Sequence, residues 1–148
     1  MSSFGPHFAA GATIGFIGIG CSTLMLSSHS ISSVLAPLVT GIMGALTPDM
    51  DIKSKSSKIM YLIFLSVAIY FIYQSKTELA LLTLIYSIVP QLFSHRGFIH
   101  SIIFAIISTA ILYYTLAYLL TFSSMVAIIS SSTYLAGFFS HKILDLDI

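Results

Sequence analysis

The sequence predicts an all-α, polytopic membrane protein with about six antiparallel transmembrane helices. Of its 148 residues, 57% are hydrophobic and only 7% are charged, whereas soluble domains carry roughly 25% charged residues. The mean hydropathy of +1.00 supports the same fold class. The net charge of +1 comes with no run of basic residues. We therefore expect membrane lipid around the chain and no nucleic acid partner, while the sequence leaves the oligomeric state open.

Six apolar runs carry this prediction, and short polar breaks separate them. Because short connections place consecutive helices antiparallel, the runs are expected to cross the membrane back and forth. The third and fourth would reach only ~22 Å as helices, so we expect them to extend into their flanks or to sit in a thinned bilayer. No repeat or linker divides the chain, so residues 1–148 are predicted to form a single transmembrane helical domain. The runs are residues 8–26, 31–46, 59–73, 79–93, 101–120 and 125–143.

Small residues and one proline indicate how the helices pack and bend. Gly11 and Gly15 form a GxxxG pattern in the first run, and Gly41 with Ala45 forms a similar pattern in the second. Small residues at this spacing allow helix backbones to approach closely in lipid, so we interpret them as packing sites. Pro90 removes an intrahelical hydrogen bond and predicts a kink in the fourth helix. A membrane proline that is merely tolerated is the alternative.

The helix count gathers the titratable residues at one end of the molecule. Counted from His7, six crossings place four of the five histidines and four of the five acids on one side of the membrane. His29 is left on the opposite side and serves as an internal control for the count. Most of the basic residues also lie on the side of the cluster. The positive-inside rule therefore predicts that this side is cytoplasmic, together with both termini. That side holds Lys53, Lys55, Lys58, Arg96 and Lys142, against Lys76 on the other.

Seven residues of this cluster are candidate metal ligands. Their imidazole and carboxylate groups suit a divalent ion such as zinc, manganese or iron. Each alone is more typical of a helix cap or an interfacial anchor, and the topology is what makes the set a candidate site. Seven ligands exceed the four of one tetrahedral ion, so two ions about 3.5–4 Å apart would use them better. The candidates are His7, Asp49, Asp51, His95, His100, His141 and Asp145.

The stretch from His95 to Ser101 lies between two apolar runs and holds two histidines and the only arginine. Titratable groups of this kind are costly near lipid and indicate function. Arg96 has the planar guanidinium that suits a phosphate, and Ser101 is predicted to cap the fifth helix. In a catalytic site, Arg96 would stabilise phosphate charge, and Asp49 or Asp51 would act as the base.

The candidate ligands lie in four short blocks. These are His7 near the start, Leu-Thr-Pro-Asp-Met-Asp at 46–51, His-Arg-Gly-Phe-Ile-His-Ser at 95–101, and Gly-Phe-Phe-Ser-His at 137–141 with Asp145. In this order, and over nearly the whole chain, they resemble the YdjM-like family of LexA-regulated inner-membrane proteins, regarded as metal-dependent hydrolases. The resemblance implies metal ligation by all seven candidates. The chain departs from the usual family pattern at Thr47 and at Ile99. Family members also usually continue past the last aspartate with Thr-Pro and a further region, whereas this sequence ends at Asp147-Ile148.

We therefore expect a membrane-bound hydrolase that uses a divalent metal, zinc or manganese, as one ion or two. It would act on a phosphoester at the cytoplasmic membrane face, where a lipid or lipid-linked substrate is one candidate. A metal- or proton-binding transporter or sensor is an alternative, and it would need polar residues deep in several helices. A structural membrane partner, whose metal only staples helix ends, is another.

Overall fold

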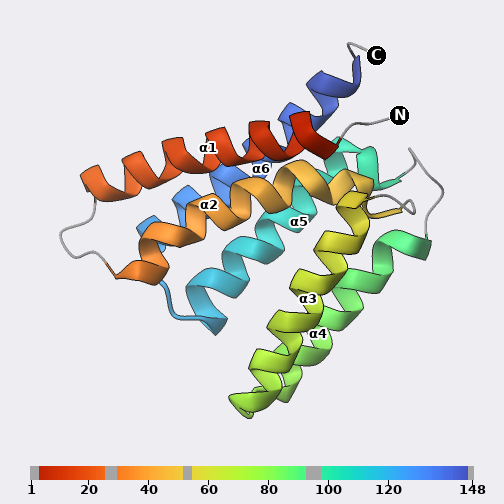
Figure 1. The fold of residues 1–148 in the computed structure, drawn as a ribbon. Helices are drawn as coiled ribbons and strands as arrows, with labels where there is room; N and C mark the ends of the chain where they lie inside the picture. Colours follow the sequence, from red (N-terminus) through yellow and green to blue (C-terminus); the bar gives the residue numbers. More distant parts are fainter. Residues whose placement is uncertain (1–3, 26–29, 52–54, 93–97, 147–148) are drawn as a thin grey trace.

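The computed structural model describes residues 4–25, 30–51, 55–92 and 98–146, and within these ranges the chain is helical with no β-strand (Figure 1). The prediction of an all-α protein is therefore confirmed. The α-helices are α1 (Phe4–Met25), α2 (Ile31–Leu46), α3 (Lys55–Tyr73), α4 (Thr77–Ile88), α5 (Ile102–Tyr114) and α6 (Ser124–Leu146). Short 3₁₀ turns are η1 (Thr47–Asp51), η2 (Val89–Leu92) and η3 (Phe98–His100), and a π-helical turn, η4 (Thr115–Leu119), follows α5.

Four stretches of the described chain are long and apolar enough to cross a membrane. They are Phe4–Met25, Ile31–Met50, Lys55–Tyr73 and Ile102–Leu119. Helix α4 is apolar but has only 12 residues. Helix α6 has 23 residues but carries many hydroxyl and titratable side chains, and it packs against α1, α2 and α5. Large apolar side chains elsewhere face outward, as expected of helices surrounded by lipid.

Consecutive helices run antiparallel, so α2, α4 and α6 end where α1, α3 and α5 begin, at the right of Figure 1. Helices α1, α2 and α6 pack closely together, and α5 lies against α6. Helices α3 and α4 form a hairpin that diverges from α2 with distance from this shared end (Figure 1). Both ends of the described chain lie at the shared end as well.

Glycines allow the backbones of α1, α2 and α6 to touch. A Cβ added at Gly11 would lie 2.8 Å from the Cβ of Ala45, and one at Gly15 would collide with the backbone of α2. Gly44 and Gly137 bring the backbones of α2 and α6 together in the same way. These contacts confirm the packing interpretation of the small-residue patterns. They also bring the end of α2 against the last helix.

The helix boundaries differ from the predicted runs, mainly at ends that carry polar residues. Helix α1 begins at Phe4 rather than at residue 8, so His7 lies inside it, and α3 begins at Lys55 rather than at residue 59. Polar side chains at a helix end can reach the surface while the backbone stays helical. Helix α4 ends at Ile88 rather than at residue 93, because Pro90 has no N–H for an α-helical bond, and the chain continues as η2.

Serine side chains cap α2, α5 and α6, where the Ser123 hydroxyl accepts a hydrogen bond of 3.4 Å from the Val126 N–H. Ser101 caps α5 as predicted, since its hydroxyl accepts a hydrogen bond of 3.1 Å from the Phe104 N–H. Ser30 caps α2 in the same way through the Ser33 N–H. The cap at Ser101 fixes where α5 starts, directly after η3 and next to His100.

Candidate metal centre

His141 lies at the centre of a buried cluster of histidine and aspartate side chains at the shared end of the helices. Its side chain is fully buried, and Nδ1 lies 2.8 Å from the carbonyl oxygen of Ala45. A carbonyl can only accept a hydrogen bond, so Nδ1 carries the hydrogen and Nε2 of the neutral ring carries the lone pair. Nε2 lies 3.3 Å from Oδ2 of Asp145 and 3.6 Å from Oδ1 of Asp49.

Neither of these two contacts is a hydrogen bond. Among the described residues, Nε2 of His141 has no hydrogen-bond partner, although buried polar atoms in folded proteins nearly always have one. Nε2 of His141 and the two carboxylate oxygens thus converge, and a cation between them would be stabilised by all three groups.

His7, near the start of α1, completes the cluster from the other end of the chain. Its ring stacks on that of His141, with centroids 4.0 Å apart, and its Nε2 lies 3.5 Å from Oδ1 of Asp145. One ligand atom from each of these three residues lies within 4.8 Å of the other two. The first and the last helix thus meet at this cluster.

Asp49 enters the cluster from η1, between α2 and α3. Its side chain is 2% exposed, and Oδ2 accepts a hydrogen bond of 3.1 Å from the Ser56 hydroxyl. Its other oxygen faces His141. Burial of a carboxylate is costly unless hydrogen bonds and an opposite charge compensate it. Tyr61 anchors the same turn, since its hydroxyl donates to the Met50 carbonyl at 2.6 Å.

The spacing of the cluster suits one tetrahedral ion. Bonds of about 2.0–2.2 Å to zinc would hold the ligand atoms about 3.3–3.6 Å apart, and the N···O distances are 3.3, 3.5 and 3.6 Å. A hydrogen bond from the second ring nitrogen to a carbonyl is also the usual support of a metal-binding histidine. By chemistry and spacing, His7, His141 and Asp145 could together hold a divalent ion, and Asp49 adjoins this group through its contact with His141.

The remaining candidate ligands either lie at the edge of the cluster or fall outside the described part of the structure. His100 lies in η3, and its ring centroid is 5.7 Å from that of His141, at the edge of the cluster. Asp51 ends η1, but its side chain is outside the described part of the structure. Also outside the described residues are His95, Arg96 and His29.

Sequence reasoning misses three groups that hold the cluster in place. Ala45 acts through its backbone carbonyl, which no residue type signals. Ser56 bonds to Asp49 across seven residues and Tyr61 bonds to Met50 across eleven, and neither spacing belongs to a known metal motif. The position of Ser56 at the start of α3, directly after the polar turn, is the one signal that could have indicated it.

Comparison with protein families matches residues 1–146 to the model described as YdjM inner membrane protein. The chain belongs to the YdjM family. No curated protein and no solved structure matches the chain. Family membership and the four membrane-length stretches agree that this is a membrane protein.

The structure shows the surroundings of Thr47 and Ile99, the two positions within the motifs that depart from the usual YdjM pattern. Thr47 is fully buried, donates to the Met43 carbonyl at 2.6 Å and lies 3.4 Å from the Tyr134 hydroxyl. Ile99 is also fully buried and packs in a cluster with Phe138. In this YdjM family member, a hydroxyl therefore supports the aspartate turn, and an apolar side chain fills the position beside His100.

Proposed function

We propose that this YdjM family protein is a metal-dependent hydrolase that cleaves phosphoesters at the cytoplasmic face of the inner membrane. The observation that carries the proposal is the buried Nε2 of His141, which faces the carboxylates of Asp145 and Asp49 at 3.3 and 3.6 Å. A divalent cation would neutralise both carboxylates and use the histidine lone pair. A single proton would compensate only one negative charge.

A divalent ion held there would polarise a phosphoryl oxygen and make water nucleophilic near neutral pH. The protein's own groups position that chemistry. Ser56 fixes the orientation of Asp49, and the carbonyl of Ala45 fixes that of His141. Asp145 keeps 20% of its side chain exposed, which leaves the cluster open on that side to a substrate. In this proposal Arg96 binds the phosphate, and the base comes from the turn with Asp49 and Asp51.

The charges at the two ends of the helices support the proposed cytoplasmic orientation. Lys55 and Lys58 lie at the start of α3 and Lys142 near the end of α6, all at the end that holds the cluster. Lys76 precedes α4 at the opposite end. Lysine and arginine are retained on the cytoplasmic side of membrane proteins, so the centre and both chain ends would face the cytoplasm.

Metal content of the detergent-purified protein tests the centre directly. We expect one or two equivalents of zinc or manganese by mass spectrometry in the wild type, and loss of the metal in Asp49→Ala and His141→Ala. Glu78→Gln is the matched control, because Glu78 is an exposed acid at the opposite end, in the first turn of α4. Wild-type protein that stays metal-free after incubation with zinc, manganese or iron would overturn the proposal.

Hydrolysis is tested on the metal-loaded protein with p-nitrophenyl phosphate and bis-p-nitrophenyl phosphate, which represent monoesters and diesters. We expect turnover that Asp49→Ala and His141→Ala abolish and Glu78→Gln retains. Tight metal binding without turnover of either ester class would instead favour a metal that only staples α1 to α6.

Transport is a second candidate, favoured by a chain of hydroxyl groups that leads from the cluster into the membrane. Tyr86 and Tyr134 lie 3.0 Å apart through their hydroxyl oxygens, and Tyr134 lies 3.4 Å from Thr47. Residues from α4, α6 and η1 thus form one polar path. Proton or zinc flux into liposomes that Tyr134→Phe slows, without any hydrolysis, would favour this function over the first.

A further inference from the structure

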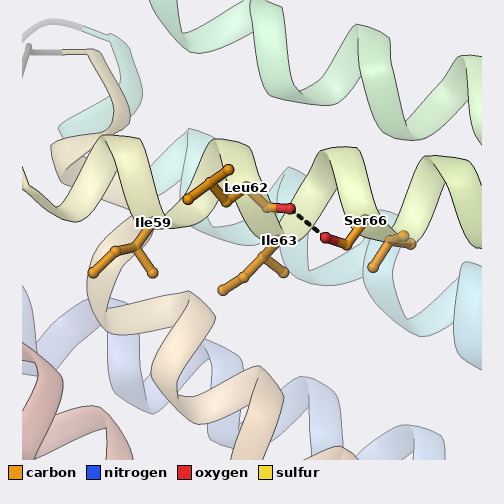
Figure 2. A pocket seen from close by; sticks show the side chains of 5 residues that line it. Ile59, Leu62, Ile63 and Ser66 are labelled. Carbon is orange, nitrogen blue, oxygen red and sulfur yellow. Dashed lines mark hydrogen bonds between the residues drawn. The ribbon is translucent and has the colours of Figure 1, made fainter.

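A shallow apolar groove of about 320 Å³ runs along α3 (Figure 2). The side chains of Ile59 and Ile63 point to the same side of the helix, where α3 diverges from α2. The one hydroxyl of the groove, on Ser66, donates to the Leu62 carbonyl at 2.8 Å and so is satisfied within α3. The lining therefore offers only apolar contact, from Ile59, Leu62, Ile63, Ser66 and Val67.

The length of the groove along α3 is close to the thickness of one membrane leaflet. The rise from Ile59 to Val67 is about 12 Å at about 1.5 Å per residue, and half of the hydrocarbon core is about 15 Å. Both residues lie within Lys55–Tyr73, a helix long and apolar enough to span the membrane. An occupant of the groove would thus lie among the acyl chains of the leaflet on the side of the metal centre.

One end of the groove lies next to the candidate centre. Ile59 is three residues after Ser56, whose hydroxyl holds Asp49, so about one helical turn separates them. Two exposed cations, Lys55 and Lys58, mark the same end of α3. The groove therefore joins an apolar track inside the membrane to positive charge and the His/Asp cluster at its surface.

We propose that this groove binds the acyl chain of an anionic phospholipid whose phosphate reaches the His/Asp centre, which makes such lipids the substrate class. This inference rests on the proposed function. An anionic phospholipid matches the groove along its whole length, with hydrocarbon against the isoleucines and phosphate beside the lysines.

The absence of tryptophan from the sequence allows a direct test of occupancy. Leu62→Trp places a single fluorophore in the groove, and Leu81→Trp places one on α4, where Leu81 is similarly exposed to lipid (65% and 60%). Each variant is reconstituted in nanodiscs of phosphatidylcholine with a minor fraction of phosphatidic acid brominated on its chains. Bromine quenches only a tryptophan that it touches, so the comparison reports where phosphatidic acid gathers.

We expect stronger quenching at Leu62→Trp than at Leu81→Trp. Addition of Lys58→Gln should weaken the apparent affinity at Leu62→Trp about fivefold, the contribution of one lysine near anionic lipid. Equal quenching at the two positions, or quenching at Leu62→Trp that Lys58→Gln leaves unchanged, would overturn the proposal.

Metal content of the same samples separates this inference from the proposed function. Preferential quenching in a metal-free protein would support lipid binding in the groove and overturn the hydrolase. A metal-loaded protein with equal quenching at both positions would overturn lipid binding in the groove, while metal binding at the His/Asp cluster would remain supported.

Discussion

Ala45 and His141 are 96 residues apart in the sequence, and a contact of 2.8 Å joins the carbonyl oxygen of one to Nδ1 of the other. The contact ties the last turn of α2 to α6. It also turns Nε2 of His141 toward Asp49 and Asp145. The geometry of the candidate centre therefore depends on how closely α2 and α6 pack.

Gly44→Ala should push α2 away from α6. A Cβ at Gly44 would collide with the carbonyl of Tyr134, and overpacking of this kind costs about 1–3 kcal/mol. We expect a lower thermal unfolding temperature in detergent and weaker metal binding. Gly20→Ala adds the same methyl group where nothing lies within 4 Å, so it should be close to neutral. Equal stability of the two variants would contradict the close helix contact.

Ser56→Ala should weaken metal binding without removing a ligand. The variant loses the hydrogen bond that orients Asp49, and loss of such a supporting partner typically costs about 10–100-fold in metal affinity. Competition with a chromogenic chelator measures the effect. Ser66→Ala on the same helix removes a hydroxyl that bonds only within α3 among the described residues, and it should bind metal as the wild type does. Unchanged affinity in Ser56→Ala would show that Asp49 does not depend on this bond.

Tyr61→Phe should destabilise the aspartate turn. The change removes the donor that contacts the carbonyl of the fully buried Met50, and an unsatisfied buried carbonyl costs about 1–3 kcal/mol. Thermal unfolding should show a lower transition temperature. Tyr70→Phe is the control on the same helix, since Tyr70 is 57% exposed. If the two variants unfold at the same temperature, the Tyr61 hydroxyl contributes nothing to the turn.

Chelation of the metal should lower stability, and zinc should restore it. An ion that binds only the folded protein stabilises it by about 2.7 kcal/mol at a free concentration 100 times its Kd. We expect the unfolding temperature of the wild type to fall with a chelator and to rise with zinc. Asp145→Asn should reduce this response, because it removes a carboxylate that faces both His7 and His141, whereas Glu78→Gln should respond fully. A wild type indifferent to both additions would contradict metal binding.

Much of the architecture could be predicted from apolar runs and polar breaks. Helical periodicity is not needed when a run is long enough to span lipid, because composition alone then requires a helix. The helix boundaries were harder to predict from the sequence. The stretches from Phe4 to His7 and from Lys55 to Lys58 are polar or mixed in composition but helical in the structure. Backbone hydrogen bonds continue there although the apolar pattern has stopped.

The cluster was accessible from the sequence because helix counting decides which end of the molecule a residue occupies. Counting brings His7, Asp49, His141 and Asp145 to one end, and the structure places His7, His141 and Asp145 within reach of one another and Asp49 beside His141. Counting cannot decide which of the residues at that end touch, or which hydroxyl or carbonyl supports them. Those contacts, like the groove on α3, arise from the angles between packed helices.

The cluster takes His7 from the first helix and His141 with Asp145 from the last. During synthesis these residues enter the membrane at opposite ends of the process. A chain that has inserted only α1 to α5 has one histidine where the complete protein has stacked rings and a carboxylate. The cluster therefore cannot assemble until α6 has been made, because α6 supplies both His141 and Asp145.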